Sequence, residues 1–198
     1  MPTIVRKDQD PRFEKLGMVT NTPKRSVISE TFDLINAWES LSTRPDATLF
    51  GADNKTKPTD IEQGQIQDTF FVASAASMAL DSDYLKSLFK LKNETDTSQL
   101  SFQMHAVGNT YEIKIDDTVP VYQPVPAQSY FVMAEGVNNV MWGPLLEKGY
   151  ARFIGTYERI AIGGVASEAI RAMTNFPGFL YKSESVKDLW TVIDQALA

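Results

Sequence analysis

The feature that most constrains the fold is the segment 68-DTFFVASAASMAL-80, which is apolar on almost every side of a helix. A helix of this kind has to be enclosed by other elements, because its apolar faces cannot meet water without cost. Its alanines are small and let neighbouring elements approach closely. The segment therefore predicts a long buried central helix that begins at about Asp68.

The loop 60-DIEQGQIQ-67 leads into this helix, and Thr69 lies at the join. A hydroxyl at a helix N-terminus is placed for nucleophilic attack, and the helix dipole there can stabilise an oxyanion. Threonine nucleophiles are normally activated by their own α-amine, however, and Thr69 lies inside the chain. The pattern therefore favours a Thr69 that starts the helix and caps backbone N–H groups over a catalytic Thr69.

The clearest strand signals lie in 100-LSFQMHAV-107 and 111-YEIKIDD-117, where apolar residues alternate with mostly polar ones. Such alternation is typical of strands with one buried face. Gly108-Asn109 between them supplies the positive φ angles of a tight hairpin turn. Residues 130–134 are expected to form a third strand, so the chain is predicted to be α+β with a small antiparallel sheet.

The remaining apolar periodicity is helical. Ser29 is a candidate N-cap for a short amphipathic helix over residues 30–41. Residues 1–28 have the pattern of an irregular arm, and residues 43–60 that of a loop. Further helices are expected over residues 83–91, 142–155, 167–174 and 185–197, the second of them ending at Gly155.

Composition excludes several classes of function. The chain has 19 Lys and Arg against 25 Asp and Glu, a net charge of −6, which disfavours nucleic acid and anionic membranes as partners. It has no cysteine, which excludes disulfides and thiolate metal sites and fits a reducing compartment. No apolar run reaches the roughly 18 residues of a membrane span, and the N-terminus lacks the apolar core of a signal peptide. We expect a cytoplasmic protein that binds no cofactor.

Three other features are weak candidates for a site. His105 is the only histidine and lies mid-strand, which favours a partly exposed sheet residue over a general base. Asp116-Asp117 closes a strand and has no companion ligands, which favours a turn or a cap over a cation site. Gly163-Gly164 and the GQIQD segment match no phosphate-binding loop.

The stretch 59-TDIEQGQIQDTFFVASAASMAL-80 resembles the nucleophile motif of the calpain-type cysteine proteases, T-D-I-x-Q-G-x-L-G-D-C-W-F/L-L-A-A-x-A-S-L. Any one block of this length is weak, but five blocks in order and at family-like spacing identify a relationship. The four later blocks that resemble the family are 113-IKIDDTVPV-121, 142-WGPLLEKGYARFIGTYERIAIGG-164, 168-EAIRAMTNFPG-178 and 188-DLWTVIDQALA-198.

The resemblance implies a helical papain-like half-core. Residues 48–198 would form the first catalytic subdomain of a calpain-type protease, with residues 1–47 as an N-terminal arm that carries a short helix. The family's catalytic His and Asn belong to a second subdomain, which we expect this chain to lack.

The chain departs from the family motif at the catalytic position and at nearby residues on either side of it. Thr69 stands at the catalytic cysteine, Gln67 at the preceding glycine and Phe70 at the following tryptophan, while Gln63 matches the oxyanion-hole glutamine. An oxyanion glutamine stabilises charge that a nucleophile's attack creates. Without that nucleophile the resemblance implies a pseudoenzyme rather than a protease.

The calcium switch of calpains is also expected to be lost. Asp60 matches one family ligand, but the loop 54-NKTKP-58 differs from the family and Val140 stands where a ligating Glu would be. Calcium prefers six or more oxygen ligands with several carboxylates. Asp60 is therefore expected to be vestigial, and no metal is expected.

These expectations lead to a functional hypothesis: a catalytically inactive calpain-like protein that serves as a structural or interaction subunit of a larger assembly. Analogy with family members that lack the catalytic residues points to the cytoskeleton or a cilium or flagellum. Other protein subunits would be its partners, contacted through Phe70, Phe176 and Phe179. The rival hypotheses are a peptide-binding regulatory decoy, a hydrolase that uses Thr69, and half of a split hydrolase completed by a partner.

Overall fold

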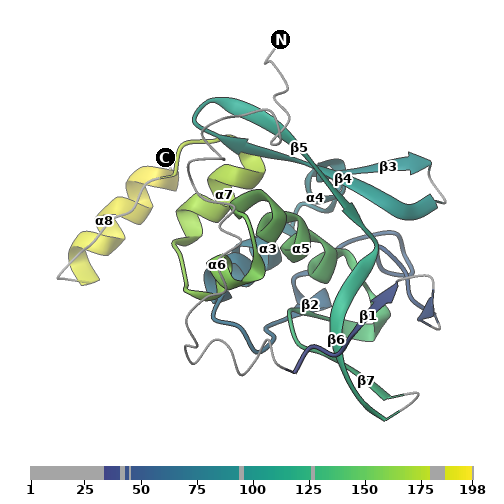
Figure 1. Cartoon of the computed structure of the whole chain (residues 1–198). Coiled ribbons are helices and arrows are strands. Elements are labelled where there is room, and N and C mark those ends of the chain that lie inside the picture. Colours follow the sequence, from purple (N-terminus) through teal and green to yellow (C-terminus); the bar gives the residue numbers. More distant parts are fainter. Residues whose placement is uncertain are drawn as a thin grey trace.

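The computed structural model describes residues 34–40, 43–44, 46–93, 96–125, 128–178 and 186–197. Its longest strand, β4 (Asp96–Ala106), forms an antiparallel hairpin with β5 (Asn109–Asp116), and β3 (Phe89–Asn93) pairs with the other edge of β4. The hairpin arches over the helices in Figure 1. Its buried face carries three directly opposed pairs, Leu100 with Ile115, Phe102 with Ile113 and Met104 with Tyr111. This face confirms the predicted alternation.

The turn of this hairpin lies one residue earlier than predicted. Ala106 pairs with Asn109, so Val107 and Gly108 form the turn, with φ angles of 50° and 76°. Two positive φ angles are the mark of the type I′ turn, which matches the twist of the strands. A β-branched residue rarely adopts such an angle. The register of the buried pairs fixes the turn at Val107 in spite of that preference.

The prediction of a helix over residues 30–41 is wrong where the structure describes it. Ala37–Ser40 is a strand, β1, which pairs with β6 (Thr118–Val125). The Asn36 side chain accepts a hydrogen bond from Gln123 N at 2.8 Å and donates one to Gln123 O at 2.9 Å. This ladder overrides the local helical spacing. Residues 1–33, with the predicted arm and the Ser29 cap, lie outside the described residues.

The third predicted strand, over residues 130–134, is shorter and begins earlier than expected. β7 covers Gln128–Phe131 and pairs with β6, which therefore has a strand on each side. Residues 132–134 are buried but leave the sheet. A separate two-stranded ladder joins β2 (Ile61–Glu62) to β8 (Glu135–Gly136). The short 3₁₀ helices η3 (Pro58–Asp60) and η4 (Val137–Asn139) flank this ladder in the sequence.

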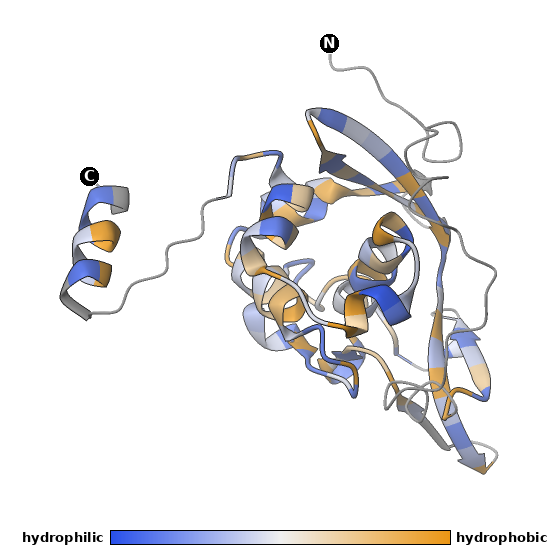
Figure 2. Ribbon diagram, turned by 60° about the vertical axis from the view of Figure 1, so that its left-hand side comes forward, coloured by the Kyte–Doolittle hydropathy of each residue, from blue (hydrophilic) through white to orange (hydrophobic). Residues whose placement is uncertain are grey.

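Helix α5 (Trp142–Ile154) is the most enclosed helix of the described part of the chain. All but three of its residues are buried, and it ends at Gly155 as predicted, with φ 139°. A Cβ on Gly149 would lie 2.7 Å from the Phe102 ring, so this glycine allows the β4–β5 sheet to approach the helix. Figure 2 shows apolar ribbon on the helices that face one another and mixed hydropathy on the outer strands.

Helix α3 (Thr69–Met78) is the predicted buried helix, but it is shorter and less enclosed than the sequence suggested. Phe71, Val72 and Ala75 are buried, whereas Ala73 faces solvent. Leu80 lies beyond the end of the helix and is 79% exposed. Alanine costs little when it is exposed, so an alanine-rich run does not by itself distinguish enclosed from half-enclosed helices.

The remaining helices surround this core. The predicted helix over 83–91 is α4 (Ser82–Leu88), and it ends earlier because Phe89 begins β3. α6 (Tyr157–Ala161) was not predicted, and its N-cap is the Thr156 hydroxyl. The helices predicted at the C-terminal end are present as α7 (Ala166–Thr174) and α8 (Val186–Leu197). α8 stands apart from the rest of the molecule in Figures 1 and 2.

Candidate functional site

The loop that precedes α3 lies tightly against the segment between β7 and β8. Gln65 N donates to Val132 O at 3.0 Å. A Cβ on Gly64 would lie 2.0 Å from Met133 O, so no larger residue fits at this position without a shift of the backbone. The close approach therefore requires glycine at position 64. It also holds the backbone next to Gln63 in place.

The Gln63 side chain is turned toward the start of α3. Its Nε2 donates to Ile66 O at 2.6 Å and to Asp68 Oδ1 at 2.7 Å. An amide nitrogen has two protons. Both are engaged within the protein, so Gln63 would have to give up one of these bonds before donating to a developing oxyanion.

Helix α3 begins at Thr69, and its N-cap residue is Asp68 rather than Thr69. Phe71 N donates to the Asp68 carbonyl at 2.7 Å, but the Asp68 side chain does not cap the helix. The prediction that Thr69 caps backbone N–H groups is therefore wrong: Thr69 is the first helical residue, and its side chain is exposed. The helix start leaves the Thr69 hydroxyl at the surface and turns the Asp68 carboxyl inward.

The Asp68 carboxyl meets a second buried acid, Glu147 of α5. Both residues are fully enclosed, at 0% exposure, and their carboxyl groups lie close enough to act on each other. Ala134 N donates to both carboxyl oxygens of Glu147 at 3.1 Å. Burial raises the pKa of Asp68, and burial together with the nearby Asp68 charge raises the pKa of Glu147 well above its ordinary value.

Tyr157 of α6 is a further group that responds to this buried polar cluster of Asp68 and Glu147. Its hydroxyl is buried and has no hydrogen-bond partner within the described residues. Burial raises its pKa well above the usual value, and the nearby Glu147 and Asp68 carboxyls raise it further. The cluster thus brings together an acid from the start of α3, next to the exposed Thr69 in the sequence, and an acid from α5.

Asp60 serves as a structural anchor. Its Oδ2 accepts hydrogen bonds from Lys57 N at 2.7 Å and from the buried indole N–H of Trp142 at 3.1 Å. These bonds tie the turn before β2 to the first residue of α5. Across the described ranges, no three His, Asp or Glu residues gather in an arrangement that could hold a metal ion.

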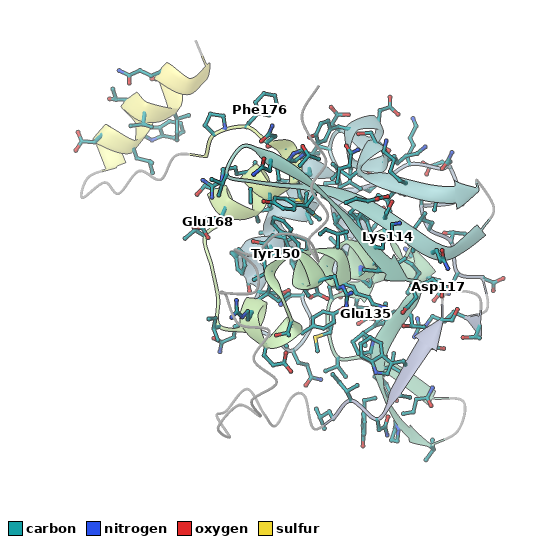
Figure 3. The ribbon with its side chains drawn as sticks, turned by 45° about the horizontal axis from the view of Figure 1, so that its top comes forward. Lys114, Asp117, Glu135, Tyr150, Glu168 and Phe176 are labelled. Atoms are coloured by element: carbon teal, nitrogen blue, oxygen red, sulfur yellow. The ribbon has the colours of Figure 1, made fainter. Side chains whose placement is uncertain are left out.

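The three phenylalanines expected at an interaction surface lie in different settings. Phe70 is half-buried and packs edge-on against Tyr150, with ring centroids 6.2 Å apart. Its neighbour Phe71 is core, stacked on Tyr150 at 4.5 Å. Phe176 is 68% exposed and points outward beyond α7 in Figure 3, whereas Tyr150 lies in the interior. Phe179 lies outside the described residues.

His105 lies in the β4–β5 hairpin, opposite Thr110. Its Nδ1 is 3.0 Å from Thr110 Oγ1, and partial burial lowers its pKa. A neutral imidazole bonded across a hairpin matches the predicted role of a sheet residue.

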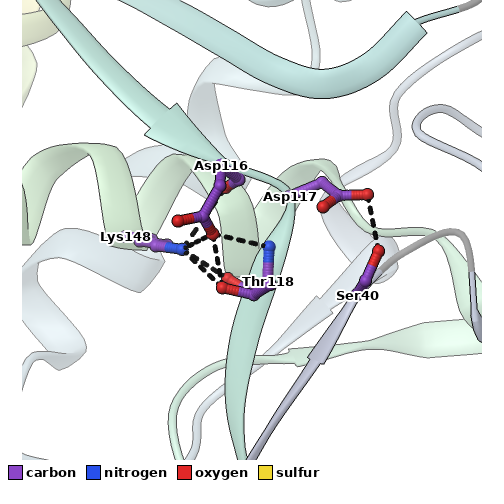
Figure 4. A network of polar contacts seen from close by, with 5 residues as sticks. All are labelled: Ser40, Asp116, Asp117, Thr118 and Lys148. Carbon is purple, nitrogen blue, oxygen red and sulfur yellow. Dashed lines mark hydrogen bonds and ion pairs between the residues drawn. The ribbon is translucent and has the colours of Figure 1, made fainter.

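Asp116 and Asp117 form the polar junction shown in Figure 4. Lys148 Nζ donates to Asp116 Oδ1 at 2.5 Å and to Thr118 O at 2.6 Å, while Ser40 Oγ donates to Asp117 Oδ2 at 2.8 Å. Burial alone would raise the pKa of Asp116, but hydrogen bonds from Lys148 and Thr118 outweigh it and lower that pKa to about 2. The pair acts as a turn, as predicted, and joins α5 and β1 to the start of β6.

Sequence reasoning missed Glu147 and Tyr157. Glu147 shares the run 142-WGPLLEKGYARF-153 with Lys148 and Arg152, so its charge alone does not mark it as buried. Tyr157 gave no signal either. Among the described residues, no helix is both long and apolar enough to cross a membrane.

Comparison with known proteins places this geometry in a family. The family model described as calpain family cysteine protease matches residues 29–198. Human calpain-14 is 30% identical over 146 residues, which cover 72% of this chain and 21% of the human protein. Human calpain-12 is 31% identical over 144 residues, which cover 71% of this chain and 19% of the human protein. Calpain clp-1 of Caenorhabditis elegans is 30% identical over 118 residues, which cover 58% of this chain and 14% of the nematode protein.

The chain spans about a fifth of the length of the two human relatives and 14% of the length of the Caenorhabditis elegans protein. The mixed helices and small antiparallel sheets match the predicted α+β, papain-like half-core. The chain contains no cysteine, and Thr69 stands at the nucleophile position of the family motif. This sequence therefore belongs to the calpain family of cysteine proteases and carries threonine where the family motif has its catalytic cysteine.

Proposed function

We propose that this chain is a calpain-type module without peptidase activity that serves as a structural or interaction subunit of a larger assembly. The observation that carries the proposal is Thr69, exposed at the first residue of α3 in place of the thiol. A thiol is partly ionised near neutral pH and is intrinsically nucleophilic, whereas a hydroxyl needs a base held against it. No hydrogen bond between Thr69 and a titratable side chain supplies such a base in the described structure.

The setting of Gln63 supports the same proposal. Both of its amide protons are bonded to Ile66 O and Asp68 Oδ1. An oxyanion donor is useful when it already points to the place where charge develops. In this chain the Gln63 amide instead stabilises the loop before α3, which fits a structural rather than a catalytic role for this residue.

Exposed apolar side chains support the interaction part of the proposal. On α8, Leu189 is 45% exposed, Trp190 60% and Ile193 36%, so the three form one apolar face of a helix that stands apart from the body. Exposed apolar groups gathered on one face mark interaction sites in soluble proteins. A cytoskeletal, ciliary or flagellar setting for the assembly rests on family analogy alone.

The peptidase question is tested with the purified chain and a broad peptide library, with and without calcium. A family member that retains the cysteine serves as the positive control. We expect no cleavage by the chain. Cleavage that disappears in Thr69→Ala would contradict the proposal, and peptide binding without cleavage, weakened by Gln63→Ala, would support the decoy hypothesis instead.

The assembly question is tested on the native complex. We expect the chain to elute from native extracts at a mass well above that of a monomer, and Trp190→Glu to shift it toward the monomer. Leu80→Glu is the matched control, because it places the same charge at another exposed apolar residue, away from α8. Wild-type protein found as a free monomer would count against the structural role.

A further inference from the structure

The buried polar cluster of Asp68 and Glu147 has more acceptor atoms than donors. Gln63 donates to Asp68 Oδ1, and Ala134 N is shared between the two carboxyl oxygens of Glu147. Asp68 Oδ2 is buried and has no hydrogen-bond partner within the described residues. An unpaired buried carboxylate oxygen is costly. The cluster therefore lacks one donor.

The neighbour of the Asp68 carboxyl that can supply this donor is the Glu147 carboxyl. Two carboxyl groups can bond to each other only if one carries a proton, since carboxylates are acceptors alone. Two adjacent carboxylates in a buried site would also repel each other strongly, and one of them then keeps its proton.

We infer that Asp68 and Glu147 share a single proton, which fastens the first turn of α3 to α5 as an acid–carboxylate pair. Glu147 holds most of it, because Glu147 has one shared backbone donor and Asp68 has the Gln63 amide to stabilise its charge. The two acids behave as one titrating unit. This inference holds whichever way the peptidase question is decided.

The surroundings of the pair offer no compensating cation. The groups that act on the two carboxyls are the Gln63 amide from the loop before α3, the backbone N–H of Asp68 itself, Ala134 N from the segment before β8, and the carboxyls themselves. From α6 the buried hydroxyl of Tyr157 is influenced by both acids and also by Asp116. No lysine or arginine in the described part of the chain acts on either acid.

The pair gives the fold a pH dependence of defined sign. In the unfolded chain a Glu loses its proton at a pH of about 4.3, whereas the folded pair retains one proton above that value. Between these two points the folded state binds one more proton than the unfolded state, so the folding equilibrium constant falls about tenfold for each unit of rising pH. Above the pH at which the pair loses its proton, the folding equilibrium constant no longer decreases with pH on account of this pair.

Glu147→Gln tests the inference directly, because the amide replaces the acid with a permanent donor to Asp68. Urea unfolding of the wild type and the variant is measured from pH 5 to pH 9. We expect the ratio of the folding constant of the variant to that of the wild type to rise with pH, by up to about tenfold per unit. A ratio that is constant over this range overturns the inference.

Glu158→Gln is the matched control, because Glu158 lies exposed on α6, next to Tyr157. Its ratio to the wild type is expected to stay constant. His105 titrates in the same range with the opposite sign, since its lowered pKa makes stability rise with pH, but it is present in all three proteins and cancels in the ratios.

A second measurement needs no variant. The carboxyl carbon of Glu147 in ¹³C-labelled wild-type protein reports its proton directly by NMR. We expect its titration midpoint well above the ordinary range for glutamate, with the Asp68 carboxyl responding at the same midpoint. A Glu147 carboxyl that is already ionised at pH 6, or two independent midpoints, overturns the inference even if Glu147→Gln does not fold.

Discussion

Two pairs of acids in this chain are opposites in sequence and in chemistry. Asp116 and Asp117 are neighbours in the sequence, and each accepts a hydrogen bond from a different donor, Lys148 or Ser40. Asp68 and Glu147 are far apart in the sequence, are both fully buried, and have carboxyl groups close enough to act on each other. The pKa of Asp116 falls to about 2, whereas those of the core pair rise.

The difference shows that the donors and water around a carboxyl decide its chemistry, and that adjacency in the sequence does not. A partly exposed acid with a lysine against it stays charged. An enclosed acid whose neighbour is a second acid keeps a proton. The first arrangement stabilises a surface junction, and the second makes the core dependent on pH.

The largest expected effect comes from removing half of the core pair. Glu147→Ala leaves a cavity in α5, an unpaired Ala134 N–H and a buried Asp68 without its partner. We expect a loss of roughly 3–5 kcal/mol in the free energy of unfolding, measured by urea denaturation at neutral pH. Glu158→Ala, on the exposed side of α6, is expected to change stability by less than about 0.5 kcal/mol. Equal effects of the two changes would show that Glu147 is not a core partner.

Much of the fold around these pairs could be predicted from the sequence. The alternation of Leu100, Phe102 and Met104 gave the buried face of the hairpin, and the apolar stripe with Gly155 gave α5 and its end. The helix predicted over 30–41 failed at β1 because the partner that makes Ala37–Ser40 a strand lies far along the chain. Local spacing contains no information about such a ladder.

The candidate site was less predictable than the fold. The family motif located Gln63, Asp68 and Thr69, but the direction of each side chain depends on what packs behind it. Gly64 allows the loop to lie against Met133; Gln63 stays exposed with its amide bonded to Asp68, and Asp68 is buried with its carboxyl near Glu147. The adjacent acids Asp116 and Asp117 are easily noticed in the sequence. The core pair is not, because its two acids lie far apart in the chain, and yet it is the pair that we infer to share a proton.

A smaller effect is expected when the surface junction loses its cation. Lys148→Met keeps most of the side-chain stem and removes the charge beside Asp116. We expect a loss of about 1 kcal/mol at neutral pH, because the Asp116 side chain is 62% exposed and water screens the pair. Lys114→Met, which removes a looser surface pair with Glu112, is the control and is expected to cost less than about 0.5 kcal/mol.

The pH dependence of this junction has the opposite sign to that of the core pair. Asp116 has a lowered pKa, so its stabilisation is present above the ordinary aspartate pKa and is lost as the pH falls through about 2. Urea unfolding at a series of acidic pH values should therefore show a smaller loss of stability in Lys148→Met than in the wild type. An identical acid profile in the two proteins would mean that Lys148 does not hold the Asp116 charge.

The smallest effect is expected at Asp117, where the bond to Ser40 needs an acceptor but no charge. Asn at this position keeps an oxygen that can accept from Ser40 Oγ, so Asp117→Asn should change the free energy of unfolding by less than about 0.5 kcal/mol. Asp117→Ala removes the acceptor and should cost about 1 kcal/mol. If Asp117→Asn costs as much as Asp117→Ala, the charge of Asp117 matters and the two acids of the junction act together. That result would make Asp116 and Asp117 a coupled pair like the one in the core.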